Sequence, residues 1–362
     1  MAVTSYGVND ALAVKLWSKK LAVEVSKATA IAPLIGTGTN SILQLKDEPM
    51  KGNGDQVTFG LRRQLIGDGV SEAQVLEGNE EALSTYSDKI TINELNHAVR
   101  VKNEQTIDAQ RVPFSLRDEA TAGLADWYGD RLSLAFFMQM GGFTAPQISF
   151  EGRIITVGAV HYLYNTPTAP TFVVRPNNRA NDESLTTGDT FDLKLIDYAV
   201  ERAKLANPRI RPVRVDGDNK YVMYLHPTQV TDLRTNTSTG QWLDIQKAVY
   251  MGSKQNNPIY DGSLGEYNNV ILREAEHVVP GVSSAAGTQI TTTRRAVLLG
   301  AQAGVMSFGM NNTASKYKMV EELFDYQREL GVSVQTILGM KKTVFNSNDF
   351  GCVVVSTLAN TH

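Results

Sequence analysis

The sequence predicts an α+β protein in which a helix and a long hairpin extend from a central body. Three observations favour this fold class. Residues 115–140 have the apolar spacing and terminal caps of one long helix. Residues 46–101 alternate in polarity like two long strands around a polar tip, and short apolar runs after residue 210 are typical of further strands. A few long helices mixed with dispersed strands define the α+β class.

The composition is that of a globular protein large enough to bury its own core. The chain has 362 residues, 42% of them hydrophobic, and a formal net charge of −3. This charge lacks the basic surplus that nucleic-acid binders usually carry. Cys352 is the single cysteine, which excludes an intramolecular disulfide and a multi-cysteine metal site. We expect it to be a small buried hydrophobe within its apolar run.

The sequence shows no targeting segment and no membrane span. Its first residues lack a basic stretch followed by an apolar stretch, and no window approaches 18 uninterrupted apolar residues. We therefore expect no membrane contact and synthesis in a reducing cytoplasm.

The N-terminal segment is predicted to be an arm. Residues 9–32 have helical spacing, a proline at position 33 stops the helix, and the small polar residues 36–41 follow as a flexible stretch. The apolar face carries Trp17, Leu21 and Val25. A helix tethered in this way must cover its apolar face with something, so we expect residues 1–45 to contact another subunit.

Residues 46–101 predict a protruding hairpin. Residues 57–61 alternate as a first strand, and a second strand is expected over residues 86–101. Sixteen residues of strand reach roughly 50 Å, about the diameter of a compact body of this length. The alternative is an ordinary two-stranded hairpin that packs on one domain and does not protrude. We predict that the hairpin contacts a neighbouring subunit through Phe59, Leu76, Glu77, Glu80 and Glu81.

Residues 115–140 predict the longest helix. Ser115 followed by Asp118 is a capping-box pattern, and Gly141–Gly142 ends the helix. At 1.5 Å per residue the helix is about 39 Å long. It is long enough to act as a spine through the whole body.

The second half of the chain predicts a mixture of elements. A helix is expected over residues 189–206 with Asp189 as its cap, and helical signals recur over residues 228–252. Asp216–Gly217 is the turn signal of a hairpin. Further strands are expected at residues 270–272, 296–299, 332–334 and 353–355.

Catalytic patterns are weak throughout the sequence. His226 precedes a proline and is a candidate base or ligand. The simpler interpretation is a loop histidine that is either hydrogen-bonded within the protein or exposed to solvent. Glu77, Glu80 and Glu81 are suited to a metal or a carboxylate pair but have no histidine nearby, which favours a solvated or intersubunit face. The acidic residues 216–219 lack the ligand spacing of a calcium loop. We therefore predict no catalytic residue, no bound cofactor and no metal site.

Short motifs spread over nearly the whole chain carry a family resemblance through their order and spacing. They are Gly54–Phe59, Leu76–Leu83, Ile92–Val99, Tyr224–Pro227, Asn257–Tyr260, Gly265–Tyr267, Leu298–Ala303, Gly339–Lys342, Phe345–Asn346 and Asp349–Gly351. In these motifs the chain resembles the major capsid proteins of phages related to coliphage N-four, a branch of the Hong Kong 97 type of capsid fold. One departure is Asn96, where a basic residue is expected.

The resemblance implies a domain order. It assigns residues 1–45 to an N-terminal arm and residues 46–101 to an extended hairpin loop that overlaps a neighbouring subunit. Residues 102–210 would form a peripheral domain around the spine helix, and residues 211–330 an axial domain. Residues 331–362 would return to the peripheral domain.

The resemblance also implies a function in assembly and not in catalysis. The chain would form hexamers and pentamers of an icosahedral phage head, be made in the bacterial host cytoplasm and end in the virion. Its partners would be copies of itself and portal, scaffolding or decoration proteins, with double-stranded DNA enclosed without sequence-specific binding. The alternatives are a nanocompartment shell of the same fold, an oligomeric hydrolase using Glu77, Glu80, Glu81 and His226, and a tail or decoration protein of a virion.

Overall fold

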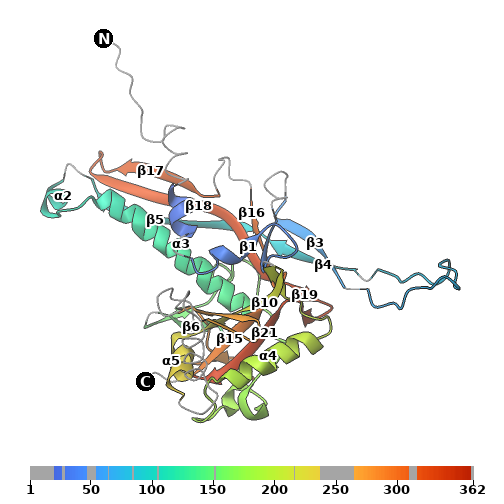
Figure 1. Ribbon diagram of the computed structural model, residues 1–362. Coiled ribbons are helices and arrows are strands. Elements are labelled where there is room, and N and C mark those ends of the chain that lie inside the picture. The colour runs from blue at the N-terminus through green and yellow to red at the C-terminus, as the bar shows by residue number, and fades with distance from the viewer. Residues whose placement is uncertain are drawn as a thin grey trace, which may run out of the picture.

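Two β-sheets and one long helix, α3 (Leu116–Met140), organise the fold (Figure 1). The computed structural model describes residues 20–26, 29–46, 54–63, 65–83, 85–103, 106–150, 152–215, 217–236, 265–309 and 316–359. Helix α3 runs along the first sheet and ends beside the second sheet, while a hairpin extends away from the body (Figure 1).

The first sheet is built around one long strand, β18 (Glu329–Lys342). The strand order is β1 (Ile35–Gly36), β2 (Leu43–Lys46), β16 (Gly304–Phe308), β18 and β17 (Lys318–Phe324), and β5 (Asn93–Lys102) also pairs with β18. Helix α3 is tied to this sheet near its start, where Arg117 forms two hydrogen bonds of 2.8 and 3.0 Å with Glu321 of β17. Farther along, the buried Tyr128 hydroxyl lies 2.8 Å from the carbonyl oxygens of Leu95 and Val334.

The second sheet is covered on both faces. Its order is β11 (Gly265–Tyr267), β12 (Val270–Glu274), β10 (Asp218–Leu225), β15 (Thr293–Leu299), β21 (Cys352–Leu358) and β8 (Val173–Val174), with β9 (Val213–Val215) paired to β10. Successive side chains point to opposite faces. In β21, Val354 therefore packs with the core around α3, whereas Val353 and Val355 pack with the core around α4 (Leu193–Leu205).

The caps predicted for α3 are confirmed. The Ser115 side chain accepts a hydrogen bond from the Asp118 backbone N–H at 3.3 Å, and the helix ends at Gly141–Gly142. Gly142 has a φ of +60°, a left-handed conformation that glycine adopts readily. The last turns of α3 are buried on every side, because this part of the helix lies between the two sheets.

A buried ionic cluster joins the end of α3 to the second sheet. Asp182 accepts hydrogen bonds from Arg175 at 2.7 Å and from Arg295 at 2.9 Å. Arg295 also donates to the carbonyl oxygens of Gly141 and Gly142, which follow the last turn of the helix. The two guanidinium groups hold the pKa of the Asp182 carboxyl below its ordinary value, although burial alone would raise it.

Shorter elements complete the chain. The helices are α2 (Ile107–Arg111) and α5 (Pro227–Thr235), with 3₁₀ turns at Ala32–Leu34, Pro176–Asn178 and Asp182–Ser184. Two-stranded pairs are formed by β3 (Gln56–Arg62) with β4 (Thr85–Thr91), β6 (Gln147–Phe150) with β7 (Arg153–Thr156), β13 (Gly281–Val282) with β14 (Gln289–Ile290), and β19 (Val344–Phe345) with β20 (Asn348–Asp349).

Three local predictions are wrong in detail. The strand expected over residues 86–101 is broken at Ile92, because β4 pairs with β3 whereas β5 pairs with β18. Helix α4 is capped by Asp192, whereas Asp189 pairs with Arg179 at 2.9 Å. The stretch 36–41 is not a free linker, because Gly36 belongs to β1 and Asn40 forms two 2.8 Å hydrogen bonds with the Arg214 backbone.

Other predictions agree with the structure or lie outside the described residues. Strands β9 and β10 pair in antiparallel register on either side of the predicted hairpin turn, and Cys352 is fully buried. Within residues 331–362, β18 lies in the first sheet and β21 in the second, and the return of this segment to the domain of the spine helix stays a prediction. The helical signals beyond residue 236 and the first part of the predicted N-terminal helix lie outside the described residues.

A buried ion pair near the end of β18 gives a stability prediction. The Lys342 ammonium lies 2.7 Å from the Asp349 carboxylate, and the two side chains are 1% and 2% exposed. Asp349→Asn leaves the buried ammonium without its counter-charge, so we expect the free energy of unfolding to fall by about 3 kcal/mol in urea titrations. Asp325→Asn is the matched control, because its ion pair with Arg328 is exposed. Equal losses in both variants would contradict the assignment.

Candidate functional site

The most prominent surface feature is the hairpin of β3 and β4. The strands pair in antiparallel register from Gln56 opposite Thr91 to Arg62 opposite Thr85. The connecting loop extends far from the body, and its tip is well separated from both sheets (Figure 1). We call residues 65–83 the hairpin tip.

The root of this hairpin is anchored to the body on one face only. Alternate side chains of the two strands form a small core with residues of β16, β19 and the β20–β21 connection: Val57, Phe59, Leu61, Ile90, Val305, Phe345 and Phe350. The Lys341 ammonium adds an ion pair of 2.5 Å with Asp88 of β4. These contacts fix the direction in which the hairpin leaves the body.

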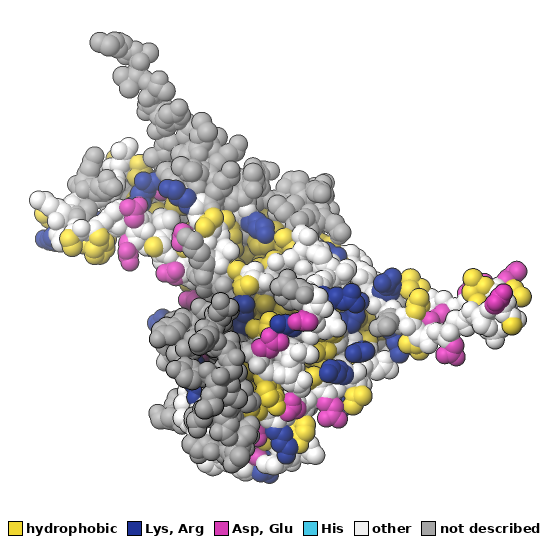
Figure 2. Space-filling model, in the orientation of Figure 1, with side chains coloured by type: hydrophobic (Ala, Val, Ile, Leu, Met, Phe, Trp, Pro, Cys, Tyr) yellow, Lys and Arg dark blue, Asp and Glu magenta, His cyan; other side chains and the backbone are white. Residues whose placement is uncertain are grey.

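The hairpin tip exposes large apolar side chains. The exposed fractions are 56% for Leu65, 72% for Ile66, 70% for Val75, 61% for Leu76 and 54% for Leu83. Figure 2 shows yellow side chains along the loop and, at its far end, yellow side chains beside acidic ones. Clustered apolar exposure of this kind marks a surface that another molecule covers.

The acidic residues of the tip shape the loop. The Glu81 carboxylate accepts hydrogen bonds from the backbone N–H groups of Ile66 and Gly67 at 2.9 and 2.6 Å, and these bonds lower the pKa of Glu81. Glu80 accepts from the Gly78 N–H at 2.8 Å. Among the described residues, no group of three or more His, Cys, Asp or Glu side chains is arranged to hold a metal ion.

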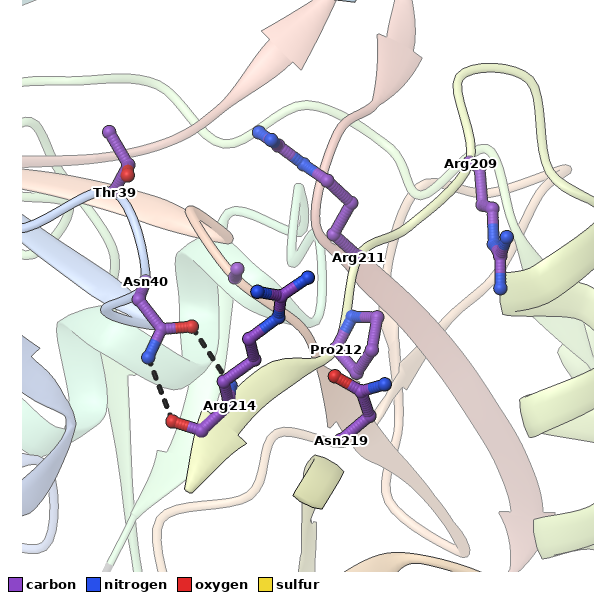
Figure 3. A pocket seen from close by; sticks show the side chains of 8 residues that line it. Thr39, Asn40, Arg209, Arg211, Pro212, Arg214 and Asn219 are labelled. Atoms are coloured by element: carbon purple, nitrogen blue, oxygen red, sulfur yellow. Dashed lines mark hydrogen bonds between the residues drawn. The ribbon is translucent and has the colours of Figure 1, made fainter. Parts of the chain in front are cut away.

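A cluster of arginines lies beside the hairpin root. Arg62 and Arg63 come from the end of β3, and Arg209, Arg211 and Arg214 come from the segment between α4 and the end of β9 (Figure 3). Figure 2 shows this dark blue patch on the face beside the hairpin. We call these five residues the root arginines. These arginines are not among the residues predicted from the sequence, although the run Arg-Ile-Arg-Pro-Val-Arg over 209–214 indicates a basic segment.

Comparisons with known proteins identify the family. The family model described as "Phage capsid protein" matches residues 5–361. The chain belongs to this phage capsid protein family. It is 26% identical, over 95% of its length and 94% of the relative, to the major capsid protein of Pseudomonas phage KPP25.

Solved structures agree with this assignment. The capsid of Ralstonia phage GP4 is 30% identical over 99% of both chains, with a TM-score of 0.77. The cyanophage Pam1 capsid is 20% identical over 92% of this chain and 93% of that chain, with a TM-score of 0.68. The expected capsid resemblance and the α+β fold of the Hong Kong 97 type are thus confirmed. The chain is a major capsid protein located in the virion shell, which favours a phage head over a nanocompartment or a hydrolase.

The predicted intersubunit residues of this capsid protein occupy different environments. Leu76, Glu77 and Glu80 are exposed at the hairpin tip, as is Glu81. Leu21 and Val25 are each 2% exposed in the subunit's own core, and Phe59 is 4% exposed in the hairpin root. Trp17 lies outside the described residues. Contact with a neighbour stays a prediction for all eight residues.

His226 has a structural role in the capsid protein. It precedes α5, where its Nδ1 atom accepts a hydrogen bond from the Thr228 N–H at 3.3 Å. Burial and the nearby Arg294 charge lower the pKa of His226 to about 4, so the side chain is neutral at pH 7. A neutral imidazole that caps a helix explains this histidine without catalysis.

None of the helices in the described part of the chain is long and apolar enough to cross a membrane.

The position of Leu21 predicts an effect on the unassembled subunit. Residues 20–26 are helical, and Leu21 packs in the same core as Leu124 of α3. Leu21→Ala should lower the free energy of unfolding of the subunit by about 2–4 kcal/mol, measured by urea titration. Val23, which is 53% exposed on the same helix, supplies the control. If Val23→Ala costs as much as Leu21→Ala, the helix is not docked as described.

The environment of His226 predicts a pH dependence. Because the folded chain holds its pKa at about 4, the unfolded chain binds the proton more readily between pH 6.5 and pH 4, and stability falls on acidification through this window. His226→Asn keeps a capping side chain but does not titrate. Between pH 7 and pH 5 the wild-type subunit should lose roughly 1–2 kcal/mol more than this variant. Parallel urea midpoints across that range would contradict the assignment.

Proposed function

We propose that this capsid protein assembles into hexamers and pentamers of an icosahedral head by placing its hairpin tip on a neighbouring subunit. The observation that carries the proposal is the set of exposed apolar side chains at the tip, from Leu65 to Leu83. The tip has no core of its own, and the hairpin root directs it away from the body (Figure 1). Only another molecule can cover it in this arrangement.

The energetics suit assembly through many modest contacts. Burying the exposed part of each apolar side chain at the tip contributes on the order of 1 kcal/mol. The five side chains together give roughly 5 kcal/mol before the cost of ordering the loop. A closed ring repeats this contact at every subunit, so a small gain per tip stabilises the whole ring.

The geometry suits rings because the two surfaces in contact are different. A tip that lies on the body of the next subunit makes a heterologous contact, and such contacts close into rings when the rotation allows it. Rings of five and six subunits together tile an icosahedral shell. We propose that residues 211–330 lie at the axial position within each ring and that residues 102–210, with the spine helix α3, lie at the periphery.

A second set of exposed apolar residues lies at the other end of the body. Ile107 of α2 is 59% exposed, Phe114 before α3 is 55% exposed, and Tyr326 in the β17–β18 turn is fully exposed. Hydrogen bonds from Asn103 to the β17–β18 turn keep α2 and this turn together. In Figure 1 this end lies opposite the hairpin. We assign it to contacts between neighbouring rings.

The remaining partners follow from the role of a container. A net charge of −3 suits a shell that encloses double-stranded DNA without sequence-specific binding, since it lacks a general basic surplus. Portal, scaffolding or decoration proteins would complete the head. The N-terminal arm, including Trp17, would add a further contact between subunits.

Polar substitution at the tip tests the proposal. Val75→Ser combined with Leu76→Ser changes only exposed side chains, so the subunit should keep its free energy of unfolding. We expect the yield of closed shells, measured by size-exclusion chromatography and negative-stain microscopy, to fall roughly tenfold or more, because every subunit in a ring loses the same contact. Ile154→Ser, at a 69% exposed position on β7, is the control and should assemble normally. Wild-type yields of shells from the tip variant would refute the proposal.

A further inference from the structure

The root arginines form a continuous cationic groove. One cavity of about 480 Å3 is lined by Arg209, Arg211 and Arg214, and an adjoining cavity is lined by Arg62 and Arg63 together with Arg209 and Arg211. Arg62, Arg209 and Arg214 are exposed, so their charges face solvent. In Figure 3 the arginine side chains project from separate points along one extended segment.

The described part of the chain supplies little negative charge to this groove. Elsewhere, arginines such as Arg117 and Arg295 pair with buried carboxylates. Arg211 instead donates to the neutral side chain of Gln302 at 2.7 Å and lies 5.7 Å from the Phe350 ring centre. Arg63 interacts at a distance with a carboxylate of its own hairpin, that of Glu81. Among the described residues, the five clustered cations therefore have little opposing charge close by.

The backbone holds the groove in a fixed shape. Ile210 is fully buried between Arg209 and Arg211, and its N–H donates to Ala203 of α4 at 3.1 Å. The Arg211 carbonyl accepts from the Ala301 N–H at 2.7 Å. The Asn40 side chain forms two hydrogen bonds of 2.8 Å with the backbone of Arg214 (Figure 3). Because the backbone of this segment is already held in place, binding costs less ordering of the chain there, which favours a recognition surface.

The hairpin tip has the opposite charge. Residues 65–83 contain five carboxylates and no lysine or arginine, and all five acidic residues are exposed: Asp68, Glu72, Glu77, Glu80 and Glu81. The acidic tip and the basic root lie at opposite ends of one extended hairpin (Figure 2). The outer part of the tip is therefore held away from the root arginines of the same subunit, whereas Glu81 at its base lies near Arg63 and Ile66 lines the second cavity.

We propose that the groove of the root arginines is the docking site for the acidic hairpin tip of an adjacent copy of this chain. This inference rests on the proposed function and names the receiving surface. The partly buried Ala206 also lines the groove, beside the buried Pro208 and Phe350, so the groove has an apolar floor between its arginines. Carboxylates bind arginine forks through two parallel hydrogen bonds.

Charge also sets the direction of assembly. Two tips repel each other, and two arginine grooves repel each other, so a symmetric two-fold contact between like surfaces is disfavoured. Only the head-to-tail pairing of a tip with a groove brings opposite charges together. This pairing is the heterologous contact from which rings are built.

A nucleic acid is the competing occupant, because arginine also recognises phosphate. The acidic tip is favoured because its charge is opposite to that of the groove and because it carries exposed apolar side chains. In addition, each subunit carries one tip and one groove. The experiment must therefore separate a defect in assembly from a defect in DNA retention.

Cross-linking tests the contact directly. Cys352 is the single cysteine and is fully buried, so the double variant Glu77→Cys with Arg209→Cys has two accessible thiols, one on the tip and one in the groove. Treatment of assembled shells with a bis-maleimide should give a ladder of multimers on denaturing gels. The two single variants should give no ladder. Assembled shells of the double variant that remain monomeric on the gel would overturn the proposal.

Charge reversal independently tests the docking of the tip into the arginine groove. Arg62→Glu with Arg209→Glu, or Glu77→Lys with Glu80→Lys, should each lower the yield of shells by about tenfold. The quadruple variant, which exchanges both signs, should recover to within about threefold of the wild type. Arg153→Glu on β7 is the matched control for a reversed arginine at an exposed position.

These experiments distinguish a wrong docking site from a failure of the proposed function, in which the tip contacts no neighbouring subunit. If Val75→Ser with Leu76→Ser abolishes shells while both reversals assemble normally, tip docking stands and the arginine groove is overturned as its receptor. If the arginine reversal assembles normally but its shells retain less DNA, the groove binds a polyanion and the proposal is also overturned. Loss of shells in each reversal, with recovery in the quadruple variant, supports it.

Discussion

One-sided burial of the hairpin root is the constraint on which the rest of the structure depends. Alternate side chains of β3 and β4, with Phe59 and Ile90 among them, pack on the body, so the hairpin leaves in one fixed direction. The same constraint prevents the tip from folding back to cover Ile66 or Leu76. A subunit of this shape carries apolar area that its own core cannot reach. We propose that this geometry drives assembly into a shell.

The body supplies a rigid platform for the hairpin. Helix α3 belongs to the core of the first sheet and also reaches the inner face of the second sheet, so one helix couples both lobes. The cluster of Arg175, Asp182 and Arg295 holds the end of that helix. The acidic tip and the root arginines then give the contact between subunits a direction.

The sequence predicted features that depend on near neighbours. Helix α3 was predicted with its caps because Ser115 and Gly141 act within one turn of the helix ends. The break at Ile92 was missed because it reflects a change of pairing partner that lies far away in sequence. Leu21 shows a further limit, since an apolar helical face looks the same whether its own core or another subunit covers it. The root arginines were missed because Arg62 and the segment 209–214 meet only in the folded chain.

Hydrogen–deuterium exchange of the hairpin tip tests the central claim most directly. The amides of residues 65–83 would be compared in the unassembled subunit and in closed shells, with the buried strand β21 as an internal reference. The account predicts fast exchange at the tip in the free subunit and strong protection in the shell, with β21 protected in both. Equally fast exchange at the tip in both states would contradict it, because the tip would then remain uncovered in the assembled particle.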